Sequence, residues 1–145
     1  MLAGVKLDSF AKSTGSKGVQ VYVPLNTPTT FEQTKTFSRS VAEVMAGRMS
    51  DRVVARADKR LRTGKVFVDW GQNDRHKSTV APHSLRAKLT HPTVSLPLTW
   101  EALTGAVDTG STAALLVAPD DALARVQETG DLFAPVLSLR QRLPG

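Results

Sequence analysis

The chain has 145 residues and no cysteine, and its nineteen Lys and Arg against thirteen Asp and Glu give a formal net charge of +6. This length suits one domain with a modest core, and the absence of cysteine excludes disulfides, thiolate metal sites and cysteine nucleophiles. No apolar run approaches the roughly 20 residues that a membrane helix needs, and the N-terminus lacks the basic and apolar blocks of a secretion signal. We therefore expect a cytoplasmic protein with no membrane partner.

A turn rich in glycine and hydroxyl groups stands near the N-terminus. Residues 2–10 are predicted to finish a helix, and Ser-Thr-Gly-Ser-Lys-Gly over residues 13–18 then runs into a strand predicted over residues 18–25. The valines of that strand share one face: Val19, Val21 and Val23. Such a turn can direct backbone N–H groups, hydroxyls and the Lys17 ammonium at one anion. It is not a Walker A loop, because the spacing differs and a strand follows it. The alternative is an ordinary polar hairpin turn.

The next segment has the pattern of an amphipathic helix. Thr29 and Glu32 have the spacing of a capping box, and the helix is predicted to run to Arg48. Its apolar side chains fall on one face, which we expect to pack into the core: Phe37, Val41, Val44 and Met45. Residues 53–63 are compatible with either a short strand or a helical turn.

An aspartate lies within an apolar strand in the middle of the chain. A strand is predicted over residues 65–70, and its apolar side chains share one face: Val66, Val68 and Trp70. Asp69 points to the other face, where a charge is costly unless a metal ion or an arginine pairs with it. A charged turn follows, and then a second extended run over residues 79–86 that ends in Arg86. A structural Asp–Arg pair and a functional site are both compatible with this pattern.

The rest of the chain is predicted to form short elements. Thr99 is expected to cap a short helix. Residues 105–113 are rich in Gly, Thr and Ala and are expected to form a linker. A last, interrupted helix is predicted to begin near Pro119, and residues 140–145 are expected to fray. The predicted fold class is therefore α+β, with a mostly antiparallel sheet flanked by helices.

The positive charge is concentrated in the central third of the chain. Residues 48–88 carry eleven Lys and Arg against four Asp, a local net charge of +7, which leaves the remainder at −1. A basic segment of this kind indicates a polyanionic partner such as nucleic acid or nucleotide. A solvated basic surface is the alternative. The candidate DNA-binding residues are Arg60, Arg62 and Lys65.

Taken together, these segments resemble a known family. The blocks that carry the resemblance are the turn over residues 13–18, Val-Phe-Val-Asp-Trp-Gly-Gln-Asn over 66–73, Ala-Pro-His-Ser-Leu-Arg over 81–86, His-Pro-Thr-Val over 91–94 and Pro-Leu-Thr-Trp over 97–100. In order and spacing they resemble the polymerase domain of bacterial ATP-dependent DNA ligase D, in the archaeo-eukaryotic primase superfamily.

The resemblance to the polymerase domain runs from about residue 5 to residue 103 and weakly to residue 133. It implies that residues 1–104 are the C-terminal part of such a domain, with the fold of its C-terminal half. Residues 105–145 would then be a linker and the C-terminal helical segment of the same domain.

The resemblance also implies which residues form the site. Asp69 matches a catalytic, metal-binding aspartate, and Mn²⁺ or Mg²⁺ is the expected cofactor of the intact domain. The positions that match nucleotide binding are Thr14, Ser16, Lys17, Gly18, Gln72 and Arg86. Three positions depart from the family pattern: Thr14 replaces Ser, Gln20 replaces His and His83 replaces Tyr.

One motif of the family is absent. Its members carry an Asp-x-Asp pair upstream of the turn, whereas no two acidic residues of this chain stand two positions apart. The chain therefore resembles only the C-terminal half, and we expect either a truncated or split gene or a second polypeptide that supplies the rest. One carboxylate cannot hold two metal ions in register, so this chain alone is expected to be inactive.

The function that the resemblance implies is a DNA-repair nucleotidyltransferase of the primase-polymerase type, acting in non-homologous end joining. The alternatives are an inert nucleotide- or DNA-binding module and a non-functional remnant. The expected partners are DNA and nucleoside triphosphates, with a separate N-terminal half, a ligase or Ku as further candidates.

Overall fold

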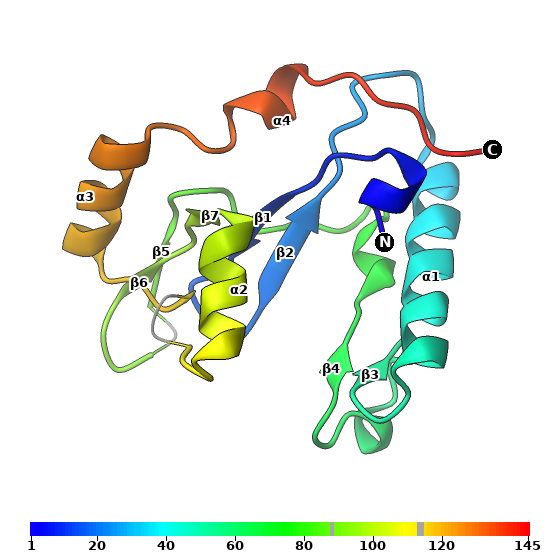
Figure 1. Ribbon diagram of the computed structural model, residues 1–145, viewed down its shortest axis with the longest axis horizontal. Helices are drawn as coiled ribbons and strands as arrows, with labels where there is room; N and C mark the ends of the chain where they lie inside the picture. Colours follow the sequence, from blue (N-terminus) through cyan, green and yellow to red (C-terminus); the bar gives the residue numbers. More distant parts are fainter. Residues whose placement is uncertain (88, 113–114) are drawn as a thin grey trace. The chain divides into compact units, whose positions relative to one another are not determined.

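The computed structural model describes residues 1–87, 89–112 and 115–145. It comprises two compact units (Figure 1). The first unit contains Met1–Thr27 and Val80–Pro144, and the second contains Pro28–Thr79 together with Gly145. Both helices and short strands are present, so the predicted α+β class is confirmed. No helix in the described part of the chain is both long and apolar enough to cross a membrane.

A three-stranded antiparallel sheet organises the first unit. Its strand order is β2-β1-β7, from β1 (Phe10–Ser13), β2 (Val19–Tyr22) and β7 (Pro97–Leu98). A second antiparallel pair joins β5 (Leu85–Arg86) to β6 (Thr93–Val94). The helices of this unit are α2 (Trp100–Asp108), α3 (Pro119–Thr129) and α4 (Ala134–Ser138). The expected cap of α2 is confirmed, because the Thr99 side chain accepts a hydrogen bond from Ala102 N.

The core of the first unit lies between α3 and the strands. Its buried cluster consists of Val94, Leu96, Val117 and Ala122, with Val126 packed against it. A second contact is aromatic, since the Phe133 ring meets the rings of Phe10 and Tyr22 edge-on at centroid distances of 6.4 and 5.2 Å. Phe10 and Tyr22 are paired across β1 and β2. These contacts fix the hairpin that carries the turn over residues 14–18.

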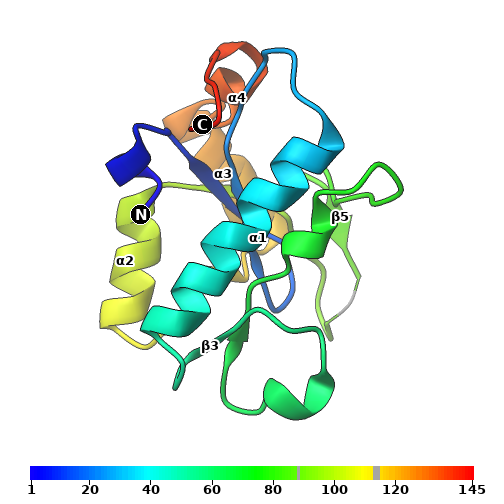
Figure 2. The same cartoon turned by 90° about the vertical axis from the view of Figure 1, so that its right-hand side faces the viewer.

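Helix α1 (Phe31–Arg48) is the main element of the second unit and packs on β3 (Val53–Val54), which pairs in parallel with β4 (Val66–Phe67) (Figure 2). The helix ends where the sequence predicts, but the capping box is one residue later than expected. Thr30 accepts from Gln33 N at 3.2 Å, and Gln33 Oε1 accepts from Thr30 N at 2.8 Å. Residues 53–63, which the sequence allows to be either a short strand or a helical turn, contain both: the strand β3 and the 3-10 turn Lys59–Leu61.

One expectation for the N-terminal segment is wrong. Residues 2–10 do not finish a helix; they form one 3-10 turn, Ala3–Val5, and then enter β1. The reason is that β1 pairs with strands on both sides, and long-range pairing outweighs the local pattern. In β2, Val19 and Val21 are 39% and 50% exposed.

Three expectations for the second half also need correction. Residues 79–86 are not one extended run, because His83 has a φ of 62° and turns the chain before β5. Part of the expected linker is helical, since α2 continues to Asp108, and residue 113 lies outside the described residues. The C-terminal end is anchored by Gln141, whose side chain and backbone hydrogen-bond Asp8, Pro24 and Leu25 at 2.7 to 3.1 Å.

Candidate anion-binding turn

The turn over residues 14–18 closes the β1–β2 hairpin and is held by its own threonine. Thr14 N donates to Gly18 O at 2.9 Å, and Gly18 N donates to Thr14 Oγ1 at 3.3 Å. The Thr14 hydroxyl donates in turn to Gly18 O at 3.0 Å. Thr14 therefore fixes the turn, while Lys17 is exposed near its end and Ser16 is partly buried.

Gly15 brings Arg86 against this turn. Its φ of 64° favours glycine. A Cβ at this position would lie 2.7 Å from Arg86 Cγ and 3.0 Å from the backbone where β6 ends, at Val94 C and Ser95 N. Thr93 Oγ1 donates to Gly15 O at 2.5 Å and closes the contact. The structure thus brings together two predicted site segments that are about 70 positions apart in the sequence.

A buried lysine beneath the turn was missed by the sequence analysis. Lys12 is 0% exposed, and its Nζ donates to Ser95 Oγ at 2.8 Å. Ser95 Oγ donates onward to Ser13 O at 2.8 Å, and Ser13 Oγ accepts from Leu96 N at 3.2 Å. Burial, and then the nearby charge of Arg86, lowers the pKa of Lys12 to about 8.

A signal for Lys12 was present in the sequence. Residues 10–13 and 19–22 are two short runs separated by a five-residue segment containing two glycines, which is a hairpin pattern. Pairing the runs about that turn places Lys12 opposite Gln20, as observed. The prediction of a helix over residues 2–10 concealed this pattern.

The site has cationic groups that form no ion pair with any described residue of their unit. No Asp or Glu among the described residues of the first unit lies within 4.0 Å of the charged groups of Lys12, Lys17 or Arg86. Arg86 Nε is buried and has no hydrogen-bond partner in the described part of the chain. Guanidinium and ammonium groups placed in this way suit a phosphate or another multivalent anion.

The environment of Asp69 differs from the prediction. Strand β4 ends at Phe67, so Asp69 is not inside a strand; it is exposed and precedes the 3-10 turn Trp70–Gln72. Gln72 Nε2 donates to Asp69 Oδ2 at 3.1 Å. Among the described residues, no three His, Cys, Asp or Glu side chains are grouped as a metal site requires. The residues present therefore do not fit a two-metal centre.

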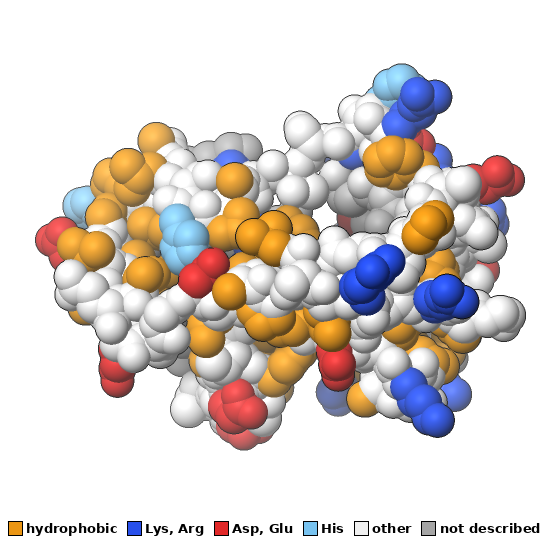
Figure 3. Space-filling model, turned by 90° about the horizontal axis from the view of Figure 1, so that it is seen from above, with side chains coloured by type: hydrophobic (Ala, Val, Ile, Leu, Met, Phe, Trp, Pro, Cys, Tyr) orange, Lys and Arg blue, Asp and Glu red, His pale blue; other side chains and the backbone are white. Residues whose placement is uncertain are grey.

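The three candidate DNA-binding residues lie in the second unit, as do Asp69 and Gln72. Arg60 NH2 pairs with Asp58 Oδ2 at 3.0 Å, and its hydrogen bonds lower the pKa of Asp58. The Arg62 guanidinium lies 3.8 Å from the Phe67 ring centroid, and Lys65 Nζ donates to Ser50 O at 2.6 Å. Lys and Arg side chains stand out on the face of the molecule in Figure 3. Lys88, at the end of the basic segment, lies outside the described residues.

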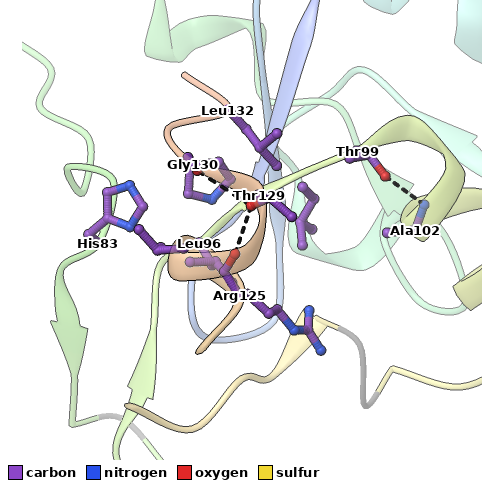
Figure 4. A pocket seen from close by; sticks show the side chains of 11 residues that line it. His83, Leu96, Thr99, Ala102, Arg125, Thr129, Gly130 and Leu132 are labelled. Carbon is purple, nitrogen blue, oxygen red and sulfur yellow. Dashed lines mark hydrogen bonds between the residues drawn. The ribbon is translucent and has the colours of Figure 1, made fainter. Parts of the chain in front are cut away.

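The first unit also has a cavity of ≈ 110 Å³ between β7 and α3 (Figure 4). Part of the cavity wall is apolar and is formed by Leu96, Leu98 and Val126. His83 and Arg125 also line the cavity. None of the predicted nucleotide-binding residues lines this cavity, so it is separate from the 14–18 turn.

Comparison with known proteins identifies the family of the chain. Residues 1–133 match the family described as "LigD, primase-polymerase domain". The chain belongs to the ligase D primase-polymerase family. The family match and the observed α+β fold confirm the resemblance drawn from the sequence blocks, and the match extends to residue 133 as expected.

Two ligase D proteins show the extent of the relationship. The chain is 37% identical over 136 residues to "Multifunctional non-homologous end joining protein LigD" of Mycolicibacterium smegmatis, covering 94% of this chain and 17% of that protein. It is 37% identical over 103 residues to the protein of the same name from Pseudomonas aeruginosa, covering 71% of this chain and 12% of that protein.

A solved ligase D structure has the same fold. It is described as "Polymerase Domain from Mycobacterium tuberculosis Ligase D in complex with DNA", and the match has a TM-score of 0.83 at 36% identity. The match covers 97% of this chain and 46% of that chain. The chain thus spans less than half of the solved relative and a smaller share of the curated ligase D proteins.

Proposed function

We propose that this chain binds nucleoside triphosphates at the 14–18 turn and is the nucleotide-binding part of a ligase D-type primase-polymerase. The observation that carries the proposal is the close approach of Gly15 to the Arg86 side chain, which brings this arginine beside the turn. The turn supplies the Lys17 ammonium and the Ser16 hydroxyl, and Thr14 with Gly18 keeps its shape. A triphosphate offers these cations a negatively charged partner, and no described Asp or Glu forms an ion pair with them.

In the intact assembly, the proposed reaction is transfer of nucleotides to DNA ends in non-homologous end joining. DNA is the proposed second partner, supported by the relative that was solved in complex with DNA. Arg60, Arg62 and Lys65 are the residues proposed to meet its phosphates. A separate N-terminal half, a ligase or Ku would complete the assembly.

The proposed metal cofactor, Mn²⁺ or Mg²⁺, cannot be held by this chain's described residues alone. Asp69 and the neighbouring Gln72 would offer one carboxylate and one amide to such an ion. Both residues are exposed, and no three His, Cys, Asp or Glu side chains are grouped as a metal site among the described residues, which favours the second candidate function. That candidate is a module that binds nucleotide or DNA without catalysing transfer.

Lys17→Ala is expected to weaken nucleoside triphosphate binding. Loss of one charged hydrogen bond costs about 1.5–3 kcal/mol, which corresponds to roughly a 10- to 150-fold higher Kd. Titration of wild type and variant with a fluorescent ATP analogue measures the difference. Lys6→Ala is the matched control, because it removes an exposed charge of the same unit outside the turn. Equal affinity of wild type and Lys17→Ala would contradict the proposal.

A further inference from the structure

We propose that Lys12 and Arg86 form a pair of cations beneath the 14–18 turn whose counter-ion is the triphosphate of a bound nucleotide. In this arrangement Arg86 contacts the phosphates, and Lys12 acts from behind as a positioning residue. The inference rests on the proposed nucleotide binding and adds Lys12 to the site.

The burial of Lys12 is the first reason. A fully buried ammonium is costly unless it is paired or fully hydrogen-bonded. Among the described residues, Lys12 Nζ donates to one acceptor, the neutral Ser95 Oγ, and lies 5.9 Å from the centroid of the Tyr22 ring. The charged group that acts on Lys12 is Arg86, which carries the same sign. Two cations therefore act on each other, and no carboxylate among the described residues forms an ion pair with either of them.

The position of Lys12 in the sheet is the second reason. Lys12 is paired with Gln20 across the hairpin, so their side chains share one face. Gln20 replaces the histidine that the family resemblance leads us to expect there. The position opposite Lys12 thus carries a neutral amide, which supplies no anionic partner for the ammonium.

A chain of hydrogen bonds connects Lys12 to the end of β1, next to the turn. Ser95 Oγ accepts from Lys12 Nζ and donates to Ser13 O, the last residue of β1 before the turn. Ser95 is itself 0% exposed, so this chain of bonds is shielded from water. A charge at Lys12 therefore acts on the turn through a medium of low dielectric constant, where electrostatic effects are strong.

The arrangement favours a triphosphate over the DNA backbone. Lys12, Lys17 and Arg86 converge on one short segment, because Gly15 lies against Arg86 and Lys12 precedes the turn by two residues. A triphosphate concentrates its negative charge over a few ångströms, whereas DNA distributes one charge per phosphate along each strand.

The protonation of Lys12 makes the proposal measurable. Its pKa of about 8 means that the free protein loses this charge as the pH rises through 8. A bound triphosphate favours the charged form and raises the pKa, so binding takes up a proton near and above pH 8. The groups that face Lys12 are Arg86, which stays protonated throughout, and the Tyr22 ring. The terminal phosphates of ATP and tripolyphosphate gain negative charge as the pH rises, which strengthens their attraction to cations, so a fall in affinity over this range reports on the protein.

The experiment is calorimetric titration of the full chain with metal-free ATP and with inorganic tripolyphosphate at pH 7 and pH 9. The wild-type affinity is expected to fall about tenfold over this range, as one lysine with a pKa of about 8 is discharged. Lys12→Met is expected to bind more weakly at pH 7 and to lose most of this pH dependence. Lys12→Arg, which cannot deprotonate, is expected to keep its affinity at both pH values. Lys6→Met is the control and should follow wild type.

Proton uptake by the wild-type protein tests the same point without any variant. Titrations at pH 8.5 in two buffers of different ionisation enthalpy should show uptake of a substantial fraction of one proton. Triphosphate binding without proton uptake, or with the same pH dependence in Lys12→Met, would overturn the role of Lys12 and leave the proposed function standing. Failure of wild type to bind either ligand would overturn both. A Lys12 effect on single-stranded DNA binding alone would assign the pair to DNA.

Discussion

The 145-residue chain by itself is expected to extend no primer, even with Mn²⁺ and all four nucleoside triphosphates. Nucleotide transfer with two metal ions requires carboxylates that converge from different elements, so that one ion supports the attacking oxygen and the other the leaving oxygen. Asp69 is exposed and hydrogen-bonded to Gln72, and no metal-ligand cluster exists among the described residues. Mg²⁺ also demands near-ideal octahedral geometry, which a single exposed carboxylate does not provide.

A primer-extension assay with the purified chain measures this directly, with the M. tuberculosis ligase D polymerase domain as the positive control. Extension by this chain that disappears in Asp69→Ala would contradict the expectation and show that other groups complete the site. Extension that appears only when a second polypeptide carrying an Asp-x-Asp pair is added would agree with it, because the missing carboxylates would then come from that partner.

The affinity of the chain for duplex DNA is expected to fall steeply with salt. The basic segment over residues 48–88 has a net charge of +7. If it neutralises about six phosphates, counterion release lowers the affinity on the order of a thousandfold between 50 and 200 mM salt. A fluorescence-anisotropy titration at several salt concentrations gives the slope of log K against log salt.

Charge-removing variants locate the DNA contacts. Arg60→Gln, Arg62→Gln and Lys65→Gln should each reduce the salt slope by about one phosphate contact. Arg62 stacks on Phe67, so its variant also needs a thermal-unfolding check. Arg142→Gln removes an exposed charge outside the segment and should leave the slope unchanged. A salt-independent affinity, or slopes unaffected by all three variants, would show that the segment is only a solvated surface.

The elements that the sequence predicts well are those set by local patterns. The helix α1 has a capping signal and an apolar period of its own, so its end at Arg48 is predictable without tertiary contacts. Its expected core face is only partly covered, because Val44 is 44% exposed and the buried residue of the helix is Ala42. The observed N-cap is Thr30 rather than the predicted Thr29, because Gln33 rather than Glu32 completes the capping box. The start of α2 is likewise predictable from a local signal, because the Thr99 side chain caps the helix.

The elements that the sequence predicts poorly depend on distant partners. Strand β4 has only two residues because its pairing with Val53 and Val54 stops there, which leaves Asp69 in solvent. The turn at His83 is set by a bond from its N–H to Ser95 O at 2.6 Å. Lys12 gains its role only when β1 lies between β2 and β7. The candidate turn can be recognised in the sequence as a motif. The positions of Lys12 and Arg86 beside it depend on the fold and could not be predicted.

The most direct test of the central claim is an NMR titration of the ¹⁵N-labelled chain with metal-free ATP. Binding at the 14–18 turn predicts that the amide resonances of Gly15 and Lys17 and the Nε–H resonance of Arg86 shift together and saturate with one Kd. Lys17→Ala should weaken that Kd. The claim is contradicted if these resonances stay fixed while those of Arg60 and Lys65, or of Leu96 and Thr129 at the cavity, shift instead.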